Sequence, residues 1–250
     1  DPSLSLEHNA ALNEIVLRGL GDLHLHTLLE LISDRNNLEV KTAAPSIAYR
    51  ETITKPAEGH CRHKKQTGGA GQFGEAYLRI EPLPRGAGFE FVNKVVGGAI
   101  PYQYIPAVET GVRQVIDAGA TYGYPMQDIR VTVYDDKHHP VDSKEIAFVQ
   151  AGKKAFTEAV ANAAPILMEP VVDVTVTVPS RCAAGVTGDL SSMRGMVSGT
   201  EALNDNRIVV SGQVPLKEMQ GYHSRLKSLT GGDGSFTMDF SLYAELPADV

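Results

Sequence analysis

An unbroken alternation of valine with polar residues in VDVTVTV, residues 172–178 of the segment VVDVTVTVP, constrains the fold of this chain more than any other feature. Every second residue is a valine, and the four valines that share one face of an extended strand are Val172, Val174, Val176 and Val178. A strand with one apolar face has to be covered on that face. We therefore expect a sheet with helices packed against it.

The rest of the last region, about 166–247, supplies the other elements of such a layer. We expect a short helix at about 181–193, strands in GMVSGTEAL and NRIVVSGQVPL on either side of a turn at NDN, and a helix in LKEMQGYHSRLKSL. GSFTMDFSLYAEL closes the region as a strand whose alternating residues we expect in the core, namely Phe236, Met238, Phe240 and Leu242. This β-α-β-β-α-β order is the ferredoxin-like plan.

The middle region, about 54–165, has a different order of elements. EAYLRIEPL is a half-buried strand, and FEFVNKVVGG is expected to be its partner. A helix follows with Pro106 in its first turn, Gly119 as its stop, and an apolar stripe made of Ile105, Val108, Val112, Val115 and Ile116. DIRVTVYDD is a further strand. Asp142 and Glu145 have the spacing of a capping box before a long helix that Pro165 ends.

The first region, about 1–53, is shorter. It has a strand from Glu14 to Leu20, a helix from Asp22 to about Asn37, and an extended segment broken by Pro45. This is the later part of a ferredoxin-like plan without its opening strand and helix, so we expect an exposed sheet edge and an exposed apolar face. The fold class is therefore α+β and multidomain, with regions 1–53, 54–165 and 166–250.

Composition limits the function classes. No apolar run approaches the roughly 20 residues that a membrane span needs, and the N-terminus has no signal-peptide pattern. The two cysteines, Cys61 and Cys182, do not indicate a disulfide scaffold and fit a reducing cytoplasm. The formal net charge is -7, so any contact with RNA must be local.

The stretch GAGQFG matches G-x-G-x-x-G at Gly69, Gly71 and Gly74. A dinucleotide site would need a buried strand before these glycines and a helix after them. GHCRHKKQT, which precedes them, is too polar for a buried parallel strand, and a strand follows. A structural hairpin loop and a binding loop both remain open. Residues 54–65 carry four basic and one acidic residue, a net +3, which suits contact with phosphate or irregular RNA.

Several motifs occur in the same order as in one known family. They are RHKKQTGGAGQFGEAYLRIEPL, FEFVNKVVGGAIPYQYIPAVETGVRQVIDAG, VTVYDDKHHPVDSKEIAF, GDLSSMRG and SLTGGDGSFTMDFSLY. Together with GLGDLHLHTLLELI and PSIAYRETI they resemble translation elongation factor G, a GTPase that drives movement of messenger and transfer RNA on the ribosome. The resemblance implies the end of domain III, the whole of domain IV and the whole of domain V. It implies that domain IV has the fold of ribosomal protein S5 domain 2 and that domain V is ferredoxin-like.

The resemblance also implies sites. Domain IV would be an arm whose tip enters the decoding region, with tip loops at Gln66–Phe73 and Asp135–Ser143 and an important histidine at His139. Domain V would abut the GTPase-associated region of the large subunit. The implied ribosome-binding and RNA-binding residues are Lys64, Lys65, Gln66, Thr67, Gly68, Gly69, Ala70, Gly71, Gln72, Phe73, Lys137, His138, His139, Asp142, Ser191, Ser192 and Arg194.

No catalytic residue, cofactor or metal is expected in this chain. No G-x-x-x-x-G-K-[ST] motif occurs: AGKKAF has Lys154 where Ser or Thr is required, and NKVV fails the N-K-x-D guanine motif at Val96. GTP and Mg²⁺ would belong to N-terminal domains of a longer parent protein. His60, Cys61 and His63 have no second ligand pair at zinc-site spacing nearby.

The chain departs from the family pattern at several positions. Ala70 stands where the first tip loop commonly has arginine, and Met193 and His26 replace a usual arginine and a usual glutamate. A translocase and a ribosome recycling or rescue factor of the same family both remain open. The implied partners are the ribosome, with its RNA and proteins, and transfer and messenger RNA at the decoding region. We expect a cytoplasmic monomer that binds neither membrane nor DNA.

Overall fold

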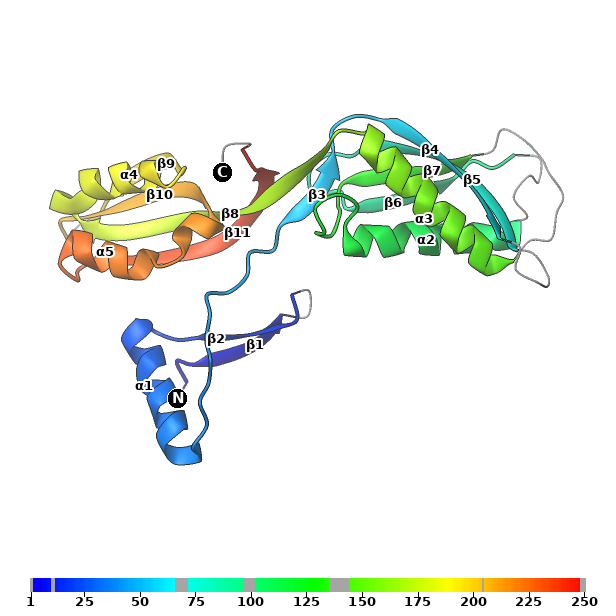
Figure 1. Cartoon of the computed structure of the whole chain (residues 1–250). Coiled ribbons are helices and arrows are strands. Elements are labelled where there is room, and N and C mark those ends of the chain that lie inside the picture. The colour runs from blue at the N-terminus through cyan, green and yellow to red at the C-terminus, as the bar shows by residue number, and fades with distance from the viewer. Residues whose placement is uncertain are drawn as a thin grey trace. The chain divides into compact units, whose positions relative to one another are not determined.

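The structure is a computed structural model that describes residues 2–9, 12–65, 72–96, 102–134, 144–203 and 205–247. The chain divides into two compact units (Figure 1). One unit comprises Asp1–Ala48 and Pro170–Leu242, and the other comprises Tyr49–Glu169 and Tyr243–Val250.

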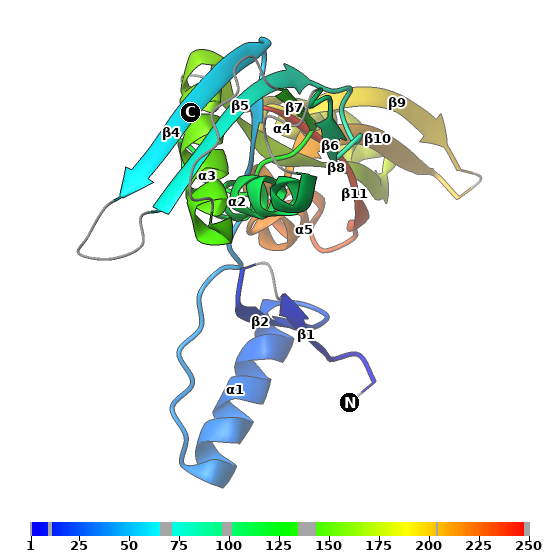
Figure 2. The ribbon, with the colours of Figure 1, turned by 90° about the vertical axis from the view of Figure 1, so that its right-hand side faces the viewer.

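The second of these units contains a four-stranded sheet in the order β4-β5-β7-β6. The strands are β4 (Ala57–Lys65), β5 (Gln72–Pro82), β7 (Ile129–Tyr134) and β6 (Phe89–Asn93). Helices α2 (Ile105–Ala118) and α3 (Glu145–Asn162) pack on one side of it (Figure 1), and Figure 2 shows β4 and β5 running side by side. The predicted apolar stripe of α2 is buried, with Pro106 in the first turn and Gly119 just after the end.

Strand β6 was expected to pair with the strand that contains Leu78, and this was wrong. It pairs in parallel with β7, with Phe91 opposite Val131. The segment between β6 and β7 contains α2, and a helical crossover of this kind joins parallel neighbours. The antiparallel partner of β5 is β4, with Gly59 opposite Leu78.

Two further details concern the start of α3 and the polar segment before the glycines, which as expected is not a buried parallel strand. The polar segment GHCRHKK is an antiparallel edge strand, β4, and its exposed polar residues alternate with less exposed ones that face α3. An edge strand can be this polar because only one of its faces meets the core. Helix α3 begins at Glu145 with Lys144 at its N-cap and without a side-chain cap bond. The predicted capping box involves Asp142, which lies outside the described residues.

A buried carboxylate holds the loop between α2 and β7. Glu51 lies in β3 (Arg50–Ile53), which pairs with Pro165–Met168 of β8 (Pro165–Pro179). The side chain of Glu51 is fully buried. Its carboxylate oxygens accept four backbone N–H bonds, from Ala120 (3.2 Å), Thr121 (2.9 Å), Tyr122 (2.8 Å) and Tyr124 (3.0 Å). The four donors neutralise most of the cost of burying the charge.

The other unit contains the predicted ferredoxin-like arrangement. Its sheet has the order β11-β8-β10-β9, from β11 (Ser235–Glu245), β10 (Arg207–Pro215) and β9 (Met196–Ala202) around β8. A 3-10 helix (Ser180–Cys182) leads into α4 (Ala183–Ser192), and another (Leu216–Met219) precedes α5 (Tyr222–Thr230). The predicted valine face of β8 is buried at Val172, Val174, Val176 and Val178, which confirms the first expectation.

The predicted apolar stripe of β11 is only partly in the core. Phe236 packs against Tyr222 of α5 with the ring centroids 5.1 Å apart. Met238, Phe240 and Leu242 are instead 41%, 60% and 41% exposed, so the expectation that they are core residues was wrong. β11 is an edge strand of the sheet. The alternation of apolar residues predicts which face of the sheet each side chain lies on, but not whether a helix covers that face.

The first 48 residues form a small ββα element. Strands β1 (Ser5–Asn9) and β2 (Glu14–Arg18) pair antiparallel, and α1 (Asp22–Asn36) follows. Strand β2 and helix α1 were predicted, whereas β1 was not. Helix α1 has no buried residue, and Leu6, Ile15, Leu20 and Leu23 are each more than half exposed, which agrees with the expected exposed apolar face.

The bonds to Glu51 predict a large loss of stability when its carboxylate is removed. Replacement of Glu51 by Ala leaves four backbone donors without their acceptor, so we expect the free energy of unfolding to fall by about 3 kcal/mol or more. Glu51→Gln keeps one carbonyl acceptor and should cost less than Glu51→Ala. Urea unfolding followed by circular dichroism measures both.

Glu109→Gln is a matched control, because Glu109 forms an exposed i,i+4 pair with Arg113. Its loss should change the free energy of unfolding by less than about 0.5 kcal/mol. Equal effects of Glu51→Gln and Glu109→Gln would contradict the structural role assigned to Glu51.

Candidate nucleic-acid interface

Four of the predicted RNA-binding residues lie together at one end of the β4–β5 pair. Lys64 is opposite Phe73, and Lys65 is opposite Gln72. Both lysines are exposed, whereas Phe73 is 8% exposed. The predicted residues between these strands, Gln66, Thr67, Gly68, Gly69, Ala70 and Gly71, lie outside the described residues.

The strand directions place the flanks of both predicted tip loops at the same end of the sheet. β4 and β7 are each antiparallel to β5, so both chains run toward the end that carries Lys65. The backbone of Ala147, in the first turn of α3, lies against Gly74 of β5. The second loop would connect β7 to α3, but Lys137, His138, His139 and Asp142 lie outside the described residues.

This end of β4 is basic. Arg62, Lys64 and Lys65 contribute three positive charges, and their cross-strand partners Glu75, Phe73 and Gln72 contribute a single acidic group. The guanidinium of Arg62 lies 5.2 Å from the ring centroid of Phe73, which holds it against the strand pair. A local cluster of this kind attracts phosphate although the net charge of the chain is -7.

A row of rings crosses the face of the sheet opposite the helices. His60, Tyr77 and Tyr134 are direct cross-strand neighbours on β4, β5 and β7. The rings of His60 and Tyr77 are stacked 4.0 Å apart at 16°, and the Tyr77 and Tyr134 centroids are 6.3 Å apart. The Glu75 carboxylate lies 2.7 Å from His60 Nε2 and accepts a 3.2 Å bond from the Tyr77 hydroxyl.

This row links the three strands on the face of the sheet that the helices do not cover. The stacked rings of His60 and Tyr77 each cover one face of the other. Arg79 lies 5.6 Å from the Tyr134 centroid and is also paired with Glu58. Sequence reasoning missed this row, because the polar composition of GHCRHKK hid its strand; the alternation of His60 and Arg62 with Cys61 was the available signal.

Gly74 explains part of the glycine pattern. A Cβ atom on Gly74 would lie 2.6 Å from the carbonyl carbon of Ala147 and 2.8 Å from the backbone nitrogen of Phe148. Glycine therefore allows β5 to pass directly against the first turn of α3. The segment after the glycines is a strand, as expected, so the helix that a dinucleotide fingerprint needs at this place is absent.

The predicted residues of the GDLSSMRG segment lie at the end of α4, in the other unit. Ser191 Oγ donates to the Thr187 carbonyl (2.9 Å), and Ser192 Oγ donates to the Asp189 carbonyl (2.7 Å). Arg194 Nε and Nη2 each lie 3.2 Å from Glu218 Oε1. The guanidinium of Arg194 is therefore already ion-paired, and the two serines are the exposed groups.

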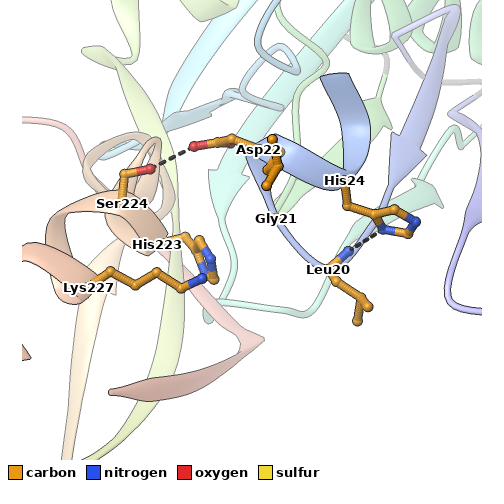
Figure 3. A pocket seen from close by; sticks show the side chains of 8 residues that line it. Leu20, Gly21, Asp22, His24, His223, Ser224 and Lys227 are labelled. Carbon is orange, nitrogen blue, oxygen red and sulfur yellow. Dashed lines mark hydrogen bonds between the residues drawn. The ribbon is translucent and has the colours of Figure 1, made fainter. Parts of the chain in front are cut away.

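A pocket of about 380 Å³ lies in the same unit as α4 (Figure 3). Its wall comes from the start of α1 and from α5, and Asp22 accepts a 2.6 Å hydrogen bond from Ser224 across it. Sequence reasoning assigned no role to this pocket, whose lining residues are Leu20, Gly21, Asp22, Leu23, His24, His223, Ser224 and Lys227.

Within the described ranges, no group of three or more His, Cys, Asp or Glu side chains is placed to hold a metal ion. The helices among these residues are all too short or too polar to cross a membrane.

The close approach at Gly74 predicts a packing defect on substitution. Gly74→Ala forces β5 and α3 apart, so we expect a loss of about 1–3 kcal/mol in the free energy of unfolding. Gly185→Ala is the matched control, because Gly185 lies within α4 and a Cβ there meets nothing within 4 Å. It should be neutral or stabilise the protein by up to about 1 kcal/mol. Denaturant unfolding would disprove the packing role if both variants had the same stability.

Comparison with known proteins identifies relatives over the whole chain. The family model described as "Elongation factor G, domain IV" matches residues 45–164, and "Elongation factor G C-terminus" matches residues 166–250. An "Elongation factor G-like protein" of Thermotoga maritima is 42% identical over 250 residues, which are 100% of this chain and 37% of the relative. "Elongation factor G" of Aquifex pyrophilus is 44% identical over 100% of this chain and 36% of its own length.

A crystal structure of a Thermus thermophilus protein also matches, with a TM-score of 0.88 and 40% identity. The match covers 100% of this chain and 37% of that chain. The chain thus spans little more than a third of the length of these relatives. Because two consecutive family models cover nearly all residues from 45 onward, this chain belongs to the elongation factor G family and comprises its domain IV and C-terminal region.

Proposed function

We propose that this chain is the ribosome-binding C-terminal portion of an elongation factor G-like translational GTPase that promotes movement of transfer and messenger RNA on the ribosome. The observation that carries the proposal is the match to the domain IV and C-terminal models over residues 45–250. The chain itself has no catalytic role in this proposal. GTP and Mg²⁺ bind in the part of the relatives' length that this chain does not span.

The proposed mechanism is mechanical. The end of domain IV beyond Lys65 and Gln72 enters the decoding region and takes the place of a transfer-RNA anticodon arm, which blocks backward movement. The C-terminal domain holds the large subunit, with Ser191 and Ser192 as contacts. GTP hydrolysis elsewhere shifts the balance between conformational states through contacts that differ between them.

The charge distribution supports this proposal. A net charge of -7 keeps most of the surface from binding RNA unspecifically, whereas Arg62, Lys64 and Lys65 favour phosphate at one end of the sheet. The ring row of His60, Tyr77 and Tyr134 supports the same strand pair and resists bending of the arm.

A recycling or rescue factor of the same family is the second candidate. It is favoured by Ala70, which removes a guanidinium that the resemblance implies for the first tip loop. Such a factor would dock on the ribosome without moving messenger RNA.

Ribosome affinity tests the basic strand end. In a full-length protein, Lys64→Gln with Lys65→Gln should weaken binding to ribosomes and reduce the slope of log K against log salt by about 1–2, because each phosphate contact releases counterions. Lys55→Gln is the control, since Lys55 precedes β4 at its other end. The phosphate contact would be refuted if the double variant and the control had the same salt dependence.

Movement of messenger RNA separates the two candidate functions. A fluorescent label on messenger RNA in pre-translocation ribosomes should report fast movement with the full-length protein. His139→Ala should slow this movement by about tenfold or more, equivalent to about 1.4 kcal/mol of barrier. Ribosome-stimulated GTP hydrolysis without movement of messenger RNA would favour the recycling factor. In that case, recovery of movement in Ala70→Arg would show that residue 70 of the first tip loop is responsible for the missing movement.

A further inference from the structure

Two buried polar side-chain atoms, one on α4 and one on α5, have no hydrogen-bond partner among the residues that the structure describes. They are Asp189 Oδ2 and the hydroxyl oxygen of Tyr222. The Asp189 side chain is 8% exposed and Tyr222 is 1% exposed, so bulk water reaches neither of them. A buried carboxylate oxygen or hydroxyl without a partner costs free energy, and proteins seldom leave one unsatisfied.

Other contacts hold the Asp189 side chain in place. Its Oδ1 atom accepts a 2.7 Å bond from Arg225 Nε and also pairs with Arg225 Nη2. Arg225 Nη2 donates further to Ser192 Oγ at 3.2 Å, which ties the same guanidinium to the end of α4. The Asp189 carboxylate is therefore held through Oδ1, while Oδ2 is buried.

The Tyr222 side chain is fixed as well. Its ring makes an edge contact with Phe236, with centroids 5.1 Å apart at 79°, and it belongs to the core cluster that includes Val174 and Val176. Burial, and after it the charge of Asp189, raises the pKa of Tyr222 to about 12. The hydroxyl therefore keeps its proton at neutral pH and offers one donor, while the carboxylate only accepts.

We propose that one water molecule binds between α4 and α5, where it accepts a hydrogen bond from the Tyr222 hydroxyl and donates one to Asp189 Oδ2. A single water supplies the acceptor and the donor that the two atoms need, and buried waters in proteins commonly join such groups. A direct bond from Tyr222 to Asp189 is the competing arrangement.

The site gives the aspartate of GDLSSMRG a role that its sequence position did not reveal. Asp189 joins α4 to α5 on two sides, through Arg225 on the outside and through the water and Tyr222 on the inside. The end of α4, which carries Ser191 and Ser192, is thereby held to the neighbouring helix. This inference does not depend on ribosome binding.

A crystal structure of the 250-residue chain at about 1.5 Å resolution tests the site. We expect an ordered water within about 2.6–3.2 Å of both Tyr222 Oη and Asp189 Oδ2. In Tyr222→Phe, the water should be lost or should move away from position 222, with the Arg225–Asp189 pair intact. In the control Tyr102→Phe, at a side chain that is 82% exposed, the water should remain. A direct Tyr222–Asp189 bond with no water between them would overturn the proposal.

A solution measurement on the unchanged chain guards against poor folding of the Phe variant. With ¹³C-labelled tyrosine, nuclear Overhauser effects between the ring protons of Tyr222 and water should have the sign of a long-lived bound water. The exposed ring of Tyr102 should give only the sign of mobile surface water. If Tyr222 and Tyr102 gave the same sign of mobile water, the site would be excluded.

Discussion

The bonds of the Glu51 carboxylate to the loop after α2 are the interaction on which the domain IV unit most depends. Four backbone donors meet two carboxylate oxygens in a place without solvent. This loop returns the chain from α2 to β7, and its position determines where β7 lies beside β5 and β6. Removal of this carboxylate would leave its four donors unsatisfied in a buried place, which is strongly destabilising.

The glycines and alanines of α3 and its sheet determine how closely the helix lies on the strands. Ala147, Ala151, Ala155 and Ala159 are fully buried, and Gly59 and Gly74 leave no side chain between the strands and the helix. The resulting contact, together with the ring row on the other face, supports β4 and β5 on both sides. A basic strand end supported in this way presents Lys64 and Lys65 at a defined position, as the proposed contact with RNA would require.

Much of the fold could be predicted where periodicity was strong. The valines of β8 and the stripe of α2 were recognised because burial follows the period of the element. The pairing of β6 was not predicted correctly, because the alternation in Phe89–Asn93 is the same for a parallel and an antiparallel neighbour. Met238 and Phe240 show the same limit. Their alternation predicted which face of the sheet they lie on, but it could not predict whether a helix packs over that face.

The sequence by itself determined the family, the ferredoxin-like order of the C-terminal domain and the basic character of residues 62–65, because these depend on residue order and local charge. Only the tertiary structure decided the roles of Glu51, Gly74 and the Asp189–Tyr222 pair. Each of these residues acts on partners that are distant in the sequence, as Glu51 does on Tyr122, 71 positions away. No local pattern carries that information, since hydrogen bonding and close packing are set by proximity in space.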